Sequence, residues 1–215
     1  MVCEQMNHEV SAFAASRRVP MSTAQELSVT ATLDQGRAIA TLAMAFSNDP
    51  ITRWVLRDAD TYLNFWPPLV QVFAGSAFDH GTADSVANHG GVALWLGPGV
   101  GPDEEAMRAL MRDAVAPGDQ DDVFGFMAQM DEFHPTYPHW YLPLIGVDLP
   151  YQGRGYGSVL LVHALRRCDH DQLPAYLEAT NPRNKRLYER HGFEQLGVIQ
   201  IGGSPPMWPM LHKPA

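Results

Sequence analysis

The chain has 215 residues, of which 46% are hydrophobic and 18% are charged, and these proportions predict a soluble globular domain with a substantial core. Its formal net charge of −9 argues against nucleic acid or an anionic membrane as a partner. The 2 cysteines form no CxxC pair, and no apolar run is long enough to span a membrane, so a disulfide framework and a transmembrane helix are not expected.

Residues 1–26 are polar and aperiodic, which predicts a flexible N-terminal tail before a single domain over residues 27–215. The N-terminus also lacks the continuous apolar segment of a signal peptide. A cytoplasmic protein is therefore the expectation.

Apolar periodicity and turn residues predict the secondary structure of the domain. In chain order we expect a strand at 27–33, helices at 35–47, 51–57 and 62–78, a hairpin of strands 82–87 and 91–96, helices at 103–115 and 121–133, a strand at 139–148, a helix at 155–169, a strand at 175–179, a helix at 182–191, and strands near 193–201 and 207–212. Pro67 and Pro68 fall near the predicted start of the third helix. Alternation of strands and helices predicts one α/β layered fold.

The most informative segment is the glycine-rich loop at 152–157, Gln-Gly-Arg-Gly-Tyr-Gly, which joins the strand at 139–148 to a helix. Glycines at such a junction let the backbone take positive φ and approach a ligand closely. The free N–H groups of the helix N-terminus, with its positive dipole end, favour an anion. The loop therefore predicts a seat for the phosphates of a cofactor.

Three phosphate-binding patterns compete for this loop. A Walker loop requires Gly-Lys-Ser/Thr, which is absent here. A dinucleotide fingerprint requires G-x-G-x-x-G, and although Glu178 follows at a suitable distance, the third glycine stands at 157 instead of the required position. The pattern Q/R-x-x-G-x-G/A fits without a gap as Gln152, Gly155 and Gly157.

A second signal lies downstream of the loop. Residues 175–179 read as a strand, Asn181 follows, and Arg-Leu-Tyr-Glu-Arg-His-Gly-Phe occupies 186–193. The loop and this segment together resemble the GNAT family of acyl-CoA-dependent N-acetyltransferases, most clearly over residues 90–213. The stretches 177–180 and 182–184 are similar to the puromycin N-acetyltransferase branch.

The resemblance implies a twisted mixed α/β sheet of six or seven strands flanked by helices, and transfer of an acetyl group from acetyl-CoA to a primary amine of a small molecule by direct attack in a ternary complex. In the family, the strand before the loop is splayed from its neighbour and exposes main-chain groups to the cofactor. The resemblance and the loop chemistry together predict cofactor contacts at Ile145, Gly146, Val147, Gln152, Gly153, Arg154, Gly155, Tyr156, Gly157, Ser158, Asn181 and Asn184. CoA is anionic, so its site should be a basic patch on an acidic body.

The candidate general acid is Tyr188, which holds the tyrosine position of the family's Leu-Tyr-Glu segment; a core tyrosine is the alternative. The candidate bases are Glu178, at the end of a strand, and His139, which opens the central strand. His134 and Glu132, just before that strand, are further candidates, and these three residues could instead be loop or rim residues. Glu178 could instead make a structural hydrogen bond, and a helix cap explains Asn181 equally well. His134 and His139 do not have zinc-ligand spacing, so no metal is expected.

Early aromatic residues are expected to build the acceptor pocket or to pack the helices: Trp54, Tyr62, Phe65, Trp66 and Phe73. Two other functions stay open, a non-catalytic acyl-CoA-binding or sensing module on the same fold and a nucleotide-dependent oxidoreductase. The sequence leaves the acceptor amine and the acyl length unassigned. A homodimer is compatible with the resemblance.

Overall fold

The computed structural model describes residues 27–215, so the tail predicted at 1–26 lies outside the described residues. A seven-stranded sheet has the order β1-β2-β3-β4-β5-β7-β6. Its strands are β1 (Val29–Ala31), β2 (Ala83–Val86), β3 (Gly91–Leu96), β4 (Trp140–Val147), β5 (Ala175–Ala179), β6 (Glu194–Gln195) and β7 (Trp208–His212). The β4–β5 pair is parallel and the other neighbours are antiparallel. The predicted mixed α/β sheet is confirmed.

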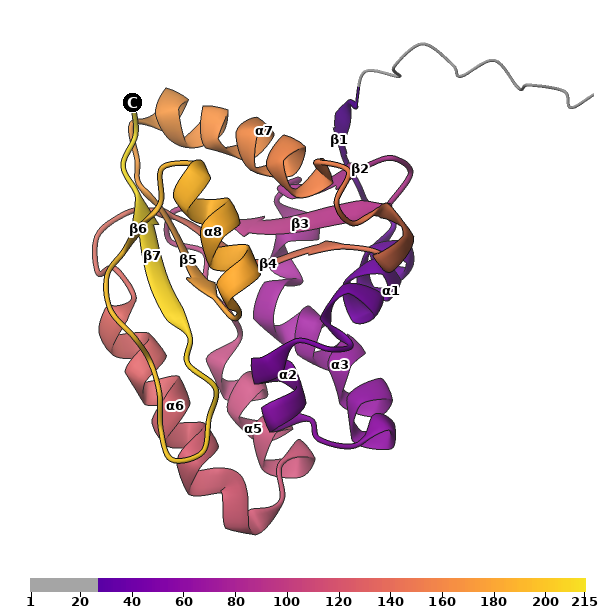
Figure 1. Ribbon diagram of the computed structural model, residues 1–215, viewed down its shortest axis with the longest axis vertical. Coiled ribbons are helices and arrows are strands. Elements are labelled where there is room, and N and C mark those ends of the chain that lie inside the picture. Colours follow the sequence, from indigo (N-terminus) through magenta and orange to yellow (C-terminus); the bar gives the residue numbers. More distant parts are fainter. Residues whose placement is uncertain (1–26) are drawn as a thin grey trace, which may run out of the picture.

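Helices pack on both faces of this sheet (Figure 1). They are α1 (Gln35–Phe46), α2 (Pro50–Val55), α3 (Ala59–Ala74), α4 (Ser76–Asp79), α5 (Glu104–Ala114), α6 (Gln120–Phe133), α7 (Tyr156–Asp171) and α8 (Pro182–Arg190). One core cluster joins α1, α3 and α4 to the sheet, and a second joins α7 and α8 to the opposite face. No helix of this described region combines the length and apolar character that a bilayer span requires.

The strands β4 and β5 separate soon after they begin. They pair only at Trp140 with Ala175 and at Tyr141 with Tyr176. On its other side β4 continues to pair with β3 as far as Val147. One edge of residues 142–147 therefore has no strand partner, and backbone polar groups on that edge are available to a ligand. The splay predicted from the family resemblance is present.

Close approach of α1 supports β4 where the splay opens. A side chain at Gly146 would place its Cβ 2.7 Å from the Cβ of Ala45 and 3.0 Å from Leu42. Real Cβ atoms do not tolerate such a contact, so glycine allows α1 to lie directly against the strand.

Helices α5 and α6 are inserted between β3 and β4, although these strands are antiparallel neighbours. A tight turn would suffice to join such a pair. In Figure 1 the two helices instead extend below the sheet, beside α2 and α3. Their packing cluster includes Met107, Met111 and Val123 against side chains of α3 such as Phe73.

Two element predictions were wrong. The strand expected at 193–201 is limited to Glu194–Gln195, with one further bridge from Ile199 to Met207. The backbone leaves the ladder near Gly197, which packs so closely on Phe133 that a Cβ there would lie 2.5 Å from the ring.

The helix expected at 62–78 starts earlier and is divided into α3 and α4. It begins at Ala59, because the Asp58 side chain accepts a hydrogen bond from the Thr61 backbone N–H. Pro67 and Pro68 therefore lie in its middle, where both are exposed. The carbonyls that lose their partners belong to Leu63 and Asn64, which are also exposed, so water can satisfy them.

Candidate active site

Two cavities meet at the splayed strands. The first, here called the loop cavity, has a volume of about 700 Å³ and is lined by the glycine loop, the end of β4 and one side of α8. The second, here called the methionine cavity, has a volume of about 270 Å³ and lies among α2, α3, α5, α6 and the start of the splay. Phe46 borders both, and the boundary falls between Leu144 and Ile145 on β4 and between Thr180 and Asn181 after β5.

The glycine loop presents an uncapped helix N-terminus to the loop cavity. Gly153 and Gly155 have φ of 75° and 85°, the left-handed region that glycine adopts without strain. Gly155 is the N-cap of α7, and within residues 27–215 no side chain caps the first helical N–H groups. These donors and the dipole of the 16-residue helix are therefore free to bind an anion.

Gln152 ties the loop to its surroundings. Its Nε2 donates to the Val147 carbonyl at 3.0 Å, and its Oε1 accepts a hydrogen bond from Arg183 at 3.3 Å. The side chain thus fixes the loop against the end of β4, and its two polar ends are already engaged.

Of the residues predicted for cofactor binding, all but Arg154 line the loop cavity: Ile145, Gly146, Val147, Gln152, Gly153, Gly155, Tyr156, Gly157, Ser158, Asn181 and Asn184. Arg154 is exposed, and its guanidinium lies 5.6 Å from the centre of the Tyr151 ring. A cation–π contact of this kind holds it at the rim.

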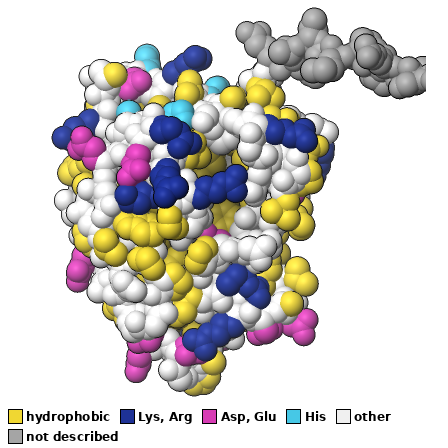
Figure 2. Space-filling model, in the orientation of Figure 1, with side chains coloured by type: hydrophobic (Ala, Val, Ile, Leu, Met, Phe, Trp, Pro, Cys, Tyr) yellow, Lys and Arg dark blue, Asp and Glu magenta, His cyan; other side chains and the backbone are white. Residues whose placement is uncertain are grey.

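Two arginines that the sequence analysis missed also line the loop cavity, Arg183 and Arg190. They are seven residues apart on α8, a spacing that places both on one face of a helix and could have identified them. Figure 2 shows Lys and Arg side chains gathered around a recess on this face of an otherwise acidic protein. The local basic patch that an anionic ligand requires is present.

Asp49 forms the partition between the two cavities. Its Oδ1 accepts from the backbone N–H groups of Ile51 and Thr52 at 3.2 and 3.1 Å, which caps α2. Its Oδ2 accepts from the Thr180 hydroxyl and, at 3.4 Å, from Asn181. This buried carboxylate therefore joins the N-terminal helices to the end of β5, and it is not free to attract a substrate.

Asn181 has its amide engaged at both ends. Its Oδ1 accepts from the backbone N–H of Asn184 at 2.9 Å and so caps α8, while its Nδ2 faces Asp49. The cap interpretation accounts for these contacts, although the residue also borders the loop cavity.

Tyr188 lines the loop cavity from α8, and its ring packs edge-on against Phe193 at 5.9 Å. Burial raises the pKa of its hydroxyl, and the negative charge of Asp49 adds to this effect. The phenol therefore keeps its proton at neutral pH. Because a thiol has a reference pKa near 8.5, complete proton transfer from this phenol to a thiolate would be uphill, whereas hydrogen-bond donation would not.

Glu178 lines the methionine cavity from β5. Burial raises the pKa of its carboxyl to about 7. The Tyr141 hydroxyl donates a hydrogen bond to Oε2 at 2.9 Å, which favours the charged form and partly opposes this rise. Its Oε1 and the Tyr176 hydroxyl are both shielded from solvent and form no hydrogen bond of good geometry within residues 27–215, although the Tyr176 hydroxyl lies near enough to favour the charged carboxylate as well. A carboxyl that titrates near neutrality and lines a cavity can accept a proton from a ligand.

His139 does not line either cavity, whereas His134 lines the methionine cavity. The Tyr137 carbonyl lies 2.7 Å from Nδ1 of His139 and can only accept, so that nitrogen carries the proton. Nε2 of His139 then accepts from Nε2 of His134 at 3.0 Å. Burial lowers the pKa of His134 to about 4, so this ring is uncharged at neutral pH.

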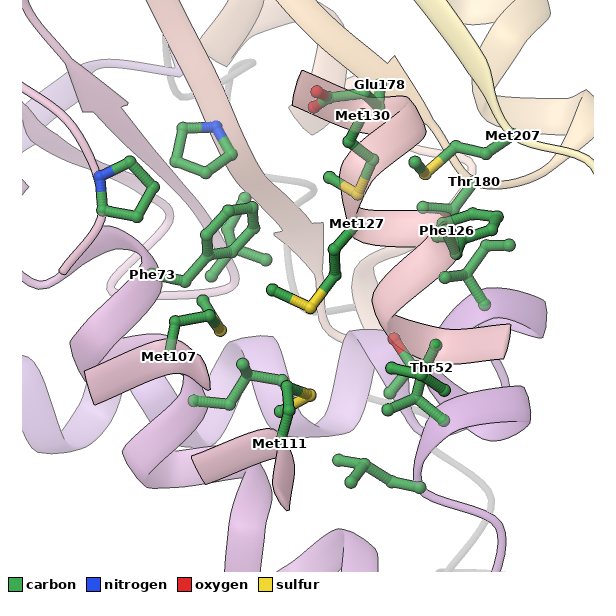
Figure 3. A pocket seen from close by; sticks show the side chains of 18 of the residues that line it. Thr52, Phe73, Met107, Met111, Phe126, Met127, Met130, Glu178, Thr180 and Met207 are labelled. Carbon is green, nitrogen blue, oxygen red and sulfur yellow. The ribbon is translucent and has the colours of Figure 1, made fainter. Parts of the chain in front are cut away.

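Only some of the aromatic residues predicted for the acceptor pocket border the methionine cavity. Trp66 and Phe73 border the methionine cavity, while Tyr62 is a core residue whose hydroxyl donates to the Ala43 carbonyl. The sequence analysis missed Phe126 and the five methionines that also border this cavity (Figure 3). Within the described chain no group of three His, Cys, Asp or Glu side chains is arranged to hold a metal ion.

Residues 102–193 match the family model described as Acetyltransferase (GNAT) family. This segment contains β4, the glycine loop and α8, the elements that build the loop cavity. The match supports the GNAT family.

An uncharacterized N-acetyltransferase from Schizosaccharomyces pombe is 28% identical over 201 residues, which cover 84% of this chain and 80% of the relative. The solved structure of histone acetyltransferase HPA2 and related acetyltransferase from Corynebacterium glutamicum has a TM-score of 0.64 and 27% identity, and the match covers 88% and 97% of the two chains. Arylalkylamine N-acetyltransferase 2 of Aedes aegypti shares the fold at a TM-score of 0.61 and 11% identity, over 87% and 99%. These matches do not confirm the puromycin N-acetyltransferase branch within GNAT.

Proposed function

We propose that this chain transfers an acetyl group from acetyl-CoA to a primary amine of a small molecule, as an acyl-CoA-dependent N-acetyltransferase acting through a ternary complex. The observation that carries the proposal is the meeting of the two cavities at the splay of β4 and β5. A glycine loop with free N–H donors lies on one side of the splay, and a carboxyl that titrates near neutrality lies on the other.

The residues of the loop cavity fit acetyl-CoA. The uncapped N-terminus of α7 would hold the pyrophosphate, and Arg183 and Arg190 would add positive charge. The unpaired edge of β4 would bind the pantetheine arm through main-chain hydrogen bonds. When bound, acetyl-CoA supplies an acetyl group activated as a thioester.

Glu178 is the proposed general base. Its carboxylate would take a proton from the substrate ammonium, whose pKa the apolar cavity lowers toward that of the carboxyl. A main-chain N–H on the open edge of β4 would stabilise negative charge on the carbonyl oxygen. The reaction forms one C–N bond and breaks one C–S bond. The ammonium loses two protons, one to Glu178 before the attack and one when the intermediate collapses; the departing thiolate takes up one proton and the other is released to solvent. Cys168 is buried with its pKa raised to about 12, which supports direct attack without a cysteine nucleophile.

Tyr188 is proposed to donate a hydrogen bond to the departing sulfur from its place on the wall of the loop cavity. The substitution Tyr188→Phe is expected to lower kcat by about 10- to 100-fold while the dissociation constant of acetyl-CoA changes less than threefold. Steady-state kinetics and calorimetric binding would measure the two effects. A wild-type kcat in this variant would remove the role, and loss of cofactor affinity would mean that the ring is structural.

A binding experiment tests the cofactor and separates the alternatives. Thermal stability is measured in parallel with acetyl-CoA, CoA, NAD, NADP and ATP. A ligand present at about 100 times its dissociation constant should stabilise the fold by roughly 2.7 kcal/mol. We expect stabilisation by acetyl-CoA and CoA alone. Stabilisation by a dinucleotide would favour an oxidoreductase, and cofactor binding with no thiol release from any amine would favour a non-catalytic acyl-CoA-binding module.

A further inference from the structure

Methionine is the most frequent residue type in the wall of the cavity that Glu178 lines. Of the 10 methionines in the chain, Met107, Met111, Met127, Met130 and Met207 all border this cavity. Figure 3 shows their side chains approaching a common space from several elements, with Phe73 and Phe126 among them. Methionine is unbranched and polarisable, and its sulfur makes favourable contacts with aromatic rings, so such a wall adapts to apolar ligands of varied shape.

Four of these methionines belong to the segment inserted between β3 and β4. Met107 and Met111 lie on α5, while Met127 and Met130 lie on α6. The sheet does not require this insertion, because β3 and β4 are already neighbours. The insertion therefore supplies four of the five methionines that border the methionine cavity.

Few charged side chains line this cavity. The Glu178 carboxyl is buried, and His134 is uncharged at neutral pH. Glu104, Arg108 and Asp131 also line the cavity, but all three are exposed at its rim. Among the described lining residues, Glu178 is therefore the one carboxylate away from the rim, so a second cation held against the methionines would be left unpaired.

We propose that the acceptor is a primary monoamine with an apolar aliphatic or aromatic body, whose amine faces Glu178 and whose body lies against the methionines of α5 and α6. This inference rests on the proposed acetyl transfer and adds the class of acceptor. The volume of about 270 Å³ lies at the small end of ligand pockets, which suits a body of one ring or a short alkyl chain. A dication whose second charge would lie against the methionines is expected to be a poorer acceptor.

The test compares two six-carbon amines that differ only at the far end, together with one aromatic monoamine. With acetyl-CoA held at saturation, thiol release is measured with hexylamine, 2-phenylethylamine and 1,6-hexanediamine. We expect kcat/KM for the two monoamines to exceed that for the diamine by on the order of 100-fold. Hexylamine should also raise the thermal stability of the CoA complex more than the diamine does. An equal or greater kcat/KM for the diamine would overturn the inference while leaving acetyl transfer intact.

Substitutions of Met127 test whether the body of the acceptor lies against the methionines. Met127→Glu is expected to lower kcat/KM for hexylamine at least about 10-fold and to shift the preference toward the diamine, because it adds a carboxylate to the wall. Met127→Leu should keep the wild-type preference, and Met44→Glu, at a methionine that is 49% exposed on α1 outside both cavities, is the matched control. An unchanged preference in folded Met127→Glu would overturn the placement of the body.

The same thiol-release assay distinguishes a failure of the acceptor inference from a failure of the proposed function. Faster turnover with hexanoyl-CoA than with acetyl-CoA, using a small amine such as ethylamine, would assign the methionine wall to the acyl chain and overturn the inference. Absence of thiol release with every amine, despite stabilisation by CoA, would instead contradict the proposed function on which it rests.

Discussion

Glu178→Gln is expected to lower kcat/KM for the amine by about 10² to 10⁴-fold. The amide keeps the size of the side chain and can still accept the hydrogen bond from Tyr141, but it cannot take a proton from an ammonium. Burial disfavours the charged carboxylate, so its replacement should not lower the melting temperature. Steady-state kinetics with saturating acetyl-CoA would measure the loss.

The pH profile gives this prediction a second readout. Below pH 7 the Glu178 carboxyl is increasingly protonated and cannot accept a proton, while above pH 7 it is ionised, so wild-type kcat/KM should rise as pH increases through about 7. In the Glu178→Gln variant kcat/KM should not show this rise with pH. Glu105→Gln, an exposed residue of α5 outside both cavities, is the control and should retain both rate and profile. A full rate in Glu178→Gln would exclude the carboxyl as the base.

Gly155→Glu is expected to weaken acetyl-CoA binding more than 100-fold. The substitution places a carboxylate at the N-cap of α7, where the proposed pyrophosphate would otherwise meet the free N–H donors. The space around Gly155 is open, so the new side chain causes no collision, but a residue other than glycine at φ 85° costs about 1–2 kcal/mol. Calorimetry with acetyl-CoA would measure the affinity.

Gly99→Glu supplies a control matched in backbone strain. Gly99 has φ 77°, also has open space at the Cβ position, and borders neither cavity. Its replacement should cost similar stability and leave the affinity for acetyl-CoA unchanged. If both variants bind acetyl-CoA as the wild type does, the loop does not hold the phosphates.

The loop and its neighbours could be found from sequence because the signals are local. A glycine that must adopt positive φ, as at 153 and 155, is encoded at its own position. The cap at Asn181 and the proline at 182 likewise define the start of α8 within a few residues. The seven-residue spacing of Arg183 and Arg190, which places both on one face of α8, is an equally local signal.

The methionine cavity could not be found in this way. Its walls come from α2, α3, α5, α6 and the strands, and each methionine of α5 and α6 is at its own position an ordinary apolar residue of an amphipathic helix. Only the packing of these helices against one another turns the shared apolar faces into a lined space. The same holds for Asp49, whose four donors include Thr180 and Asn181 from far along the chain.

By itself, then, the sequence determined the mixed α/β fold, the order of its elements and the segments that resemble GNAT, because helix periodicity, caps and glycine conformation depend on neighbours in the chain. The tertiary structure decided where β4 and β5 part, which of the candidate bases lies in a cavity, and how far burial raises the pKa of Glu178. Those properties depend on desolvation and on contacts between residues distant in sequence, which no local pattern records.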